Sequence, residues 1–146
     1  MISVAFILKF IVAAVGAGTP LLFGTVGEIM SEKVGHLNLG VEGMMAIGAV
    51  AGFAAGYATG NLAAAMAAAF LAGMLAALIY AVLTVGFMAN QNVIGLTLTI
   101  FGVGLSNFIG VYMIGKTDSN TWQLPAELIA QMKNVTIPVL SDIPVL

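Results

Sequence analysis

Four long stretches of apolar residues constrain the fold of this chain more than any other feature. They run over residues 10–30, 39–58, 61–87 and 93–114. A helix needs about 20 mostly apolar residues to cross the hydrocarbon core of a bilayer. Each stretch is about that long, and 61% of the residues are hydrophobic while only 7% are charged. We therefore predict an all-α membrane protein with about four transmembrane helices.

Some of these helices should be broken, and the chain should divide into two parts. Pro20 interrupts the first stretch and predicts a kink, because proline has no N–H to donate to the preceding turn. Residues 1–114 form the predicted transmembrane region. Residues 115–146 contain a polar run, three prolines and a short helical pattern over residues 126–133, so they predict an ordered loop outside the bilayer. The apolar ending suggests that the chain stops before a further span.

Small residues recur every fourth position within the apolar stretches. Spacing four places such residues on one face of a helix, where they let two backbones approach closely in lipid. We therefore predict that the second helix packs against a neighbour through a row of glycines, here termed the glycine ladder. It consists of Gly48, Gly52, Gly56 and Gly60. We leave open that such smooth helix faces let helices slide past one another during gating.

Composition and motifs exclude several classes of function. The formal net charge is −2 without any arginine, which argues against nucleic-acid binding. The chain lacks cysteine, and no partner supports a metal site at His36, its single histidine. No set of side chains has credible catalytic spacing, so we do not expect an enzyme or a cofactor. Residues 110–117 match the P-loop pattern, but they form the end of an apolar helix instead of a loop after a strand.

Polar residues beside the second and fourth apolar stretches are the candidates for a solute pathway. Asn38 is placed to cap the second helix, and Glu42 lies near the positive end of that helix. A carboxylate so close to lipid suggests either a structural lock for the preceding turn or a contact with the pathway or a partner. Asn90, Gln91 and Asn92 begin the fourth helix, where they can cap it or line a polar path for a hydroxyl-rich solute.

Residues 27–45, read as GEIMSEKVGHLNLGVEGMM, carry a specific resemblance. They resemble the N-terminal region of bacterial ABC permeases of the branched-chain amino acid/ribose type, and the branch that imports nucleosides or simple sugars is the nearest. Residues 19–22, 90–96 and 137–144 are also similar to that family. The departure is in length, since such permeases are about twice as long, so the chain resembles their N-terminal half.

The resemblance implies a multi-pass subunit of the bacterial inner membrane that forms part of the pathway for a small polar solute. It implies three protein partners besides membrane lipid: an ATP-binding subunit that binds the ATP, a second permease subunit and a substrate-binding lipoprotein. It also places residues 115–146 outside the cytoplasm and the turn over residues 31–38 inside. Counting lysines in the loops gives the opposite orientation, and we follow the resemblance because the count depends on few residues.

A second hypothesis from another class stays open. The glycine ladders also suit a small homo-oligomeric channel or a structural membrane subunit. A ring subunit of a rotary ATPase fits less well, because it needs a carboxylate in mid-helix and Glu42 lies near a helix start.

Overall fold

The protein consists of membrane-length helices in the computed structural model, which describes residues 4–116 and 121–133. Four of the helices are long and apolar enough to cross a membrane, so the predicted all-α membrane fold is confirmed. In chain order the elements are α1 (Val4–Lys33), α2 (Val41–Thr59), α3 (Leu62–Ala81), the π-helix η1 (Val82–Gly86), α4 (Gln91–Gly115) and α5 (Ala126–Lys133).

The helix α2 packs on α3 through glycines. A Cβ atom at Gly52 would lie 2.9 Å from the Cβ of Ala69, and one at Gly48 would lie 3.1 Å from the carbonyl oxygen of Ala69. Gly56 is buried in the same way beside Ala65. Only glycine leaves room for backbones this close, which is how membrane helices gain van der Waals contact in lipid.

Gly60 does not continue this packing face, because it lies one residue beyond the end of α2. It adopts a left-handed conformation with φ of 64° and donates its N–H to the carbonyl of Gly56. Glycine adopts this conformation without steric cost and commonly ends helices. The next residue, Asn61, caps α3 by accepting from the N–H groups of Ala63 and Ala64. The chain therefore makes a tight turn over residues 59–61.

The helix α2 also packs on α4, at a crossing still closer than its contact with α3. A Cβ atom at Gly43 would overlap the backbone of Leu98 and Thr99, and one at Gly102 would overlap the backbone of Gly43. Both glycines are buried. The helix α2 thus lies between α3 and α4, with glycines on both contact faces.

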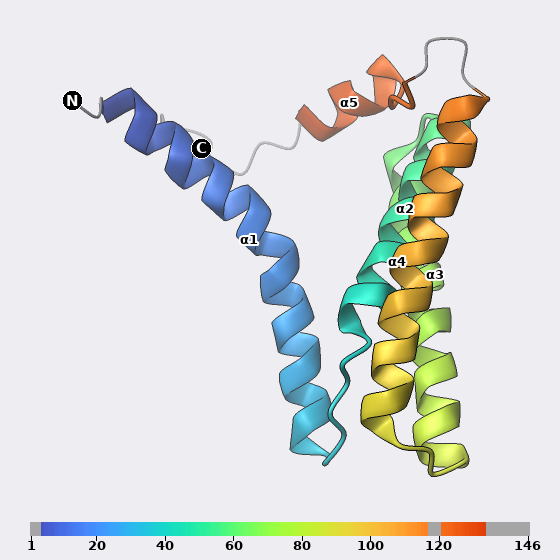
Figure 1. Ribbon diagram of the computed structural model, residues 1–146. Coiled ribbons are helices and arrows are strands. Elements are labelled where there is room, and N and C mark those ends of the chain that lie inside the picture. The colour runs from blue at the N-terminus through green and yellow to red at the C-terminus, as the bar shows by residue number, and fades with distance from the viewer. Residues whose placement is uncertain (1–3, 117–120, 134–146) are drawn as a thin grey trace.

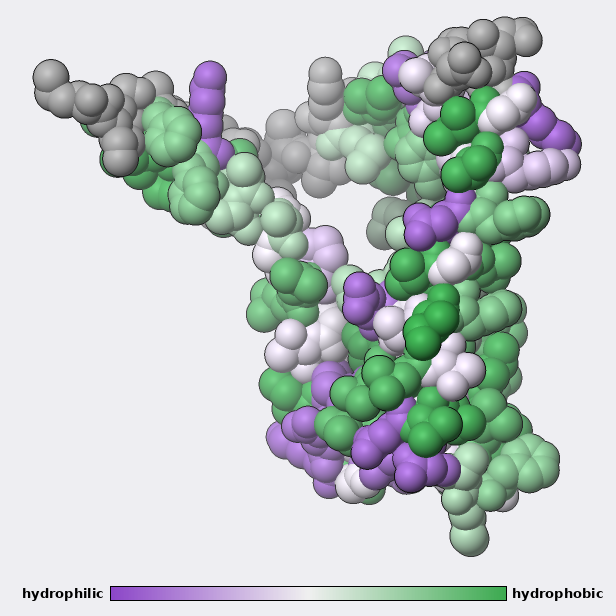
Figure 2. All heavy atoms as spheres, viewed as in Figure 1, coloured by the Kyte–Doolittle hydropathy of each residue, from purple (hydrophilic) through white to green (hydrophobic). Residues whose placement is uncertain are grey.

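The helix α1 diverges from the other three helices and approaches α2 only near the loop that joins them (Figure 1). None of its most apolar window is buried. The helix is continuous through Pro20, and Figure 1 shows it changing direction partway along its length. The sides of the molecule are largely apolar, while polar residues gather at the end where α1 meets the bundle (Figure 2).

The third predicted span does not remain α-helical to residue 87. It changes into the π-helix η1 after Ala81, and Met88 follows with a positive φ of 52°. The hydroxyl of Thr84 donates to the carbonyl of Tyr80 at 2.8 Å. Such a bond from a side chain to the preceding turn competes with regular helical bonding and often bends helices.

The short helix α5 has the bounds that the sequence predicts, and it closes the opposite end of the bundle. Leu128 is 1% exposed and lies against Gly56. The side chain of Gln131 accepts from the N–H of Leu62 and donates to the carbonyl of Gly60. Trp122 packs edge-on against Phe53 with ring centroids 4.5 Å apart. The expectation of a truncated further span concerns residues 134–146, which lie outside the described residues.

Candidate functional site at the helix junction

Residues 34–40, here termed the junction loop, connect α1 to α2 within the segment that carries the family resemblance. The loop begins with a turn in which Gly35 has φ of 85° and donates its N–H to the carbonyl of Glu32. The N–H of His36 donates to the carbonyl of Ser31. After this turn the loop runs between the helices instead of away from them, so its backbone polar groups need partners.

Side chains from α1 and α4 bind the N–H groups of the junction loop. The Oε1 atom of Glu28 accepts from the N–H of Asn38 at 2.7 Å. The Oε1 atom of Gln91 accepts from the N–H of Leu37 at 3.0 Å. The two loop N–H groups are therefore bound by side chains of the preceding helix α1 and of the distant helix α4.

Hydroxyl groups from α3 and α4 bind the loop carbonyls. Tyr80, which is 6% exposed, donates to the carbonyl of Leu37 at 2.8 Å. Thr99 donates to the carbonyl of Leu39 at 2.7 Å. Side chains from α1, which precedes the loop, and from α3 and α4, which are distant in sequence, thus hold the junction loop. The arrangement fixes the relative position of these helices at one end of the bundle.

Asn38 does not cap α2 directly, so this expectation is wrong. The N-cap residue is Gly40, and no side chain bonds to the helix from that position. Asn38 instead accepts from the N–H of Gly40 at 3.0 Å, which shapes the loop before the helix begins. A Cβ atom at Gly40 would lie 3.1–3.3 Å from Asn38, Leu98 and Gly95, so a larger N-cap residue would crowd these neighbours.

Glu42 lies in the first turn of α2, as predicted, and its side chain is exposed. It lines a cleft of about 620 Å³ together with Glu28 and Glu32 of α1. Glu28 is partly buried, and its Oε2 atom is buried without a hydrogen-bond partner among the described residues. The described residues contain no group of three or more acidic, His or Cys side chains placed to hold a metal ion.

The three amides at the start of α4 have separate roles. Asn90 caps the helix by accepting from the N–H groups of Asn92 and Val93 at 3.0 and 3.3 Å. Gln91 binds the junction loop. The side chain of Asn92 is exposed and makes no hydrogen bond to any described residue. Of the two alternatives for Asn90, capping is present, and the sequence did not indicate the contact of Gln91 with the junction loop.

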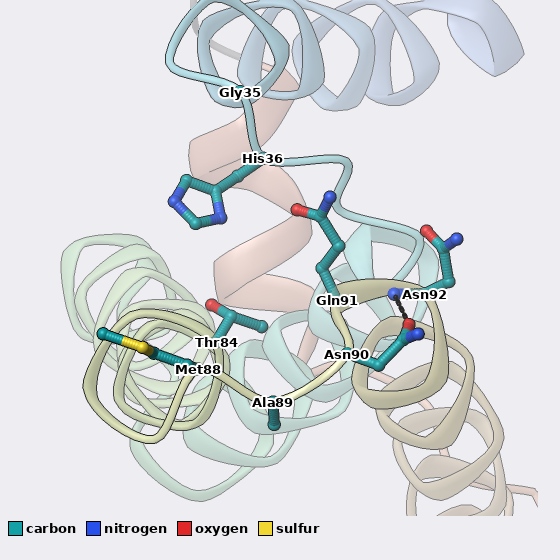
Figure 3. Close-up of a pocket in the computed structure, with 8 residues that line it drawn as sticks. All are labelled: Gly35, His36, Thr84, Met88, Ala89, Asn90, Gln91 and Asn92. Atoms are coloured by element: carbon teal, nitrogen blue, oxygen red, sulfur yellow. Dashed lines mark hydrogen bonds between the residues drawn. The ribbon is translucent and has the colours of Figure 1, made fainter.

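A pocket of about 360 Å³, here termed the amide pocket, lies beside the junction loop (Figure 3). In Figure 3, His36 extends from the junction loop, Gln91 rises from the start of α4, and Thr84 lies below both in this view. The pocket brings together two segments that are far apart in the sequence, the junction loop and residues 84–92. Its lining residues are Gly35, His36, Thr84, Met88, Ala89, Asn90, Gln91 and Asn92.

An apolar groove of about 880 Å³ separates α1 from α2 and α3 on another side of the junction. Its walls include Pro20 and Phe23 from α1, Met45 from α2, and Phe70 and Met74 from α3. This chemistry suits contact with lipid or another apolar helix and differs from the polar lining of the amide pocket.

Tyr80 and Thr99 could not be assigned to the junction from the sequence alone. Tyr80 lies within an apolar stretch, where an isolated tyrosine also fits ordinary packing. Its partner, Leu37, is 43 residues away, and the partner of Thr99 is 60 residues away. Gly43 was also missed as a packing residue, because it does not share the spacing of Gly48, Gly52 and Gly56.

Comparison with known proteins identifies a family over most of the chain. The family described as the branched-chain amino acid transport system permease component matches residues 10–141. No solved structure is significantly similar to the chain.

Three curated relatives are also similar. A protein assigned as a glucose ABC transporter permease from Haloferax volcanii is 40% identical over 98 residues, which are 67% of this chain and 30% of the relative. The guanosine ABC transporter permease of Bacillus subtilis is 32% identical over 87% of this chain and 40% of the relative. A nucleoside ABC transporter permease of Lactococcus lactis is 30% identical over 88% and 40%. The chain spans less than half the length of each of these relatives.

Proposed function

Because the chain belongs to the family of branched-chain amino acid transport system permease components, we propose that it forms part of the membrane pathway of an ABC importer. The observation that carries this proposal is the junction loop. The segment most typical of the family is held by side chains from α1, α3 and α4 at one end of the bundle. A polar junction of this kind inside an apolar bundle suits a function in passing a polar solute.

The proposed solute is a nucleoside or a simple sugar. The names of the three relatives refer to glucose, guanosine and nucleosides. The polar groups around the amide pocket are amides, a hydroxyl and an imidazole, and such groups bind hydroxyl-rich solutes by hydrogen bonds.

Energy would come from a separate subunit. ABC permeases act with ATP-binding and substrate-binding partners, and we propose an ATP-binding subunit, a second permease subunit and a substrate-binding lipoprotein as the partners of this chain.

The P-loop-like run over residues 110–117 supports the assignment of ATP to a partner. Its first six residues are the last turns of α4 and not a loop, and the Lys116 ammonium lies 4.5 Å from the ring centroid of Tyr112. The junction loop would face the cytoplasm.

Gene deletion with complementation tests this proposal in cells. Deleting the gene should abolish high-affinity uptake of labelled guanosine or glucose, and the intact gene should restore it. The E28A variant, which loses its bond to the junction loop, should restore it less well than E32A, because Glu32 lies one turn away and is exposed. The tagged protein should also co-purify with an ATP-binding protein. Unchanged uptake of both solutes, together with purification as a homo-oligomer alone, would instead support the self-contained channel.

A further inference from the structure

The helix α1 is anchored to the bundle through residues 24–33, here termed the anchored part. A Cβ atom at Gly24 would lie 2.9 Å from the Sδ atom of Met45, and Glu28 binds the junction loop. The earlier part of the helix, residues 4–15, diverges from the bundle and is here termed the arm (Figure 1). One helix thus combines an end that is held by its neighbours with an end that extends away from them.

Residues 16–20, read as GAGTP, connect the arm to the anchored part. Pro20 has no N–H to donate to the carbonyl of Gly16, so one helical hydrogen bond is missing at this point. The hydroxyl of Thr19 donates to the carbonyl of Val15 at 2.8 Å, and a bond of this kind often bends helices. The two glycines of the segment add backbone freedom, because they have no Cβ atom. Features that weaken a helix are therefore concentrated in this segment.

We infer that residues 16–20 are a hinge, and that the arm pivots about it to cover or uncover one end of the apolar groove between α1 and the bundle. The wall that α1 contributes to this groove runs from Pro20 to Ser31, and Phe70 of α3 belongs to another wall. The α1 wall therefore ends at the hinge, and the position of the arm determines how far the groove is open at that end. This inference does not depend on the proposed function.

The hinge has room to bend, and its small residues suit closure against the bundle. A Cβ atom at Gly16 or Gly18 would meet nothing within 4 Å among the described residues. Small residues let membrane helices approach closely and gain van der Waals contact. From the middle of the hinge to Val4 the helix is about 20 Å long, and a rotation of about 20°, the lower limit for a sharp kink, moves its end by about 7 Å. Closure would exchange contacts with lipid for contacts with the bundle.

Distances between pairs of spin labels on the full chain in lipid nanodiscs, measured by pulsed electron paramagnetic resonance, test this inference. The sequence has no cysteine, so introduced cysteines carry the labels specifically. The pair F10C/I100C joins the arm to α4, and the control pair M30C/I100C joins the anchored part to the same position. All three side chains are exposed. We expect the distance distribution of the arm pair to be broader by about 7 Å, the displacement that a rotation of about 20° produces.

Two variants of the hinge should narrow the distribution of the arm pair toward that of the control pair. Pro20→Ala restores the N–H that binds the carbonyl of Gly16, and G18A reduces backbone freedom. The matched control is G27A, because a methyl group at Gly27 also meets nothing within 4 Å but lies in the anchored part. G27A should leave both distributions unchanged. The second hinge variant keeps the test decisive where the first fails to fold.

Three results would overturn the inference. Equally narrow distributions for the two label pairs would show that α1 is rigid. Equally broad distributions would show that the whole helix moves about the junction loop and does not bend at residues 16–20. A broad distribution of the arm pair that neither hinge variant narrows would place the flexibility outside the hinge.

Discussion

The carboxylate Oε1 of Glu28 lies 2.7 Å from the backbone nitrogen of Asn38, and this bond ties the end of α1 to the start of the helix bundle. The rest of α1 diverges from the bundle (Figure 1). The relative position of α1 therefore depends strongly on a few contacts near the junction loop. The bond gives Glu28 a structural role that its place at the end of an apolar helix did not reveal.

Replacing Glu28 by alanine should destabilise the protein by about 1–2 kcal/mol. A hydrogen bond to a charged group contributes about 1.5–3 kcal/mol, and the buried, unpaired Oε2 atom offsets part of that gain. The E28Q variant keeps an acceptor and should lose less. Thermal unfolding of the purified protein measures the difference. The control is E32A, and an equal loss of stability in that variant would refute the special role of Glu28.

The Y80F variant should lower stability by about 0.6–1.7 kcal/mol, which are the average and the maximum measured for hydrogen bonds between helices of a membrane protein. It removes the hydroxyl that donates to Leu37 and leaves the ring in place. Y57F is the comparison, because Tyr57 is 37% exposed near the other end of α2. Equal melting temperatures for Y80F and the unmodified protein would show that the bond to Leu37 contributes nothing.

The G43A variant should disrupt the crossing of α2 and α4. The added methyl group would overlap the backbone of Leu98 and Thr99, so the two helices must separate. We expect a loss of at least about 1–3 kcal/mol from overpacking and a lower yield of folded protein. In G104A, by contrast, the new methyl group meets nothing within 4 Å, so stability should be unchanged or slightly higher. Size-exclusion profiles and melting temperatures compare the two.

Truncating Leu128 to alanine should release α5 from the end of the bundle. Leu128 is 1% exposed, and replacing a buried leucine by alanine costs about 2–5 kcal/mol. The loss should be local, because α5 has few contacts beyond α2 and α3. Limited proteolysis should therefore cleave L128A faster near residues 121–133. Ile129 is 40% exposed, and I129A should be cleaved like the unmodified protein. Faster cleavage in both variants would argue against specific docking through Leu128.

The four spans and the bounds of α5 were predictable because they depend on local patterns of apolar and turn residues. The turn at Gly60 and the cap at Asn90 followed from residue type and position in the same way. The junction was not predictable, since its bonds join residues up to 60 positions apart. Spacing alone also misplaced Gly60 on a packing face, because it does not show where a helix ends.

The most direct test of the central claim is uptake by proteoliposomes that contain the protein, its proposed ATP-binding and permease partners, and the substrate-binding lipoprotein. The account predicts that labelled guanosine or glucose accumulates only when ATP and this chain are both present. It also predicts that E28A slows accumulation while E32A does not. Passive equilibration of solute by this chain alone, with no dependence on ATP, would contradict the importer and establish a self-contained channel.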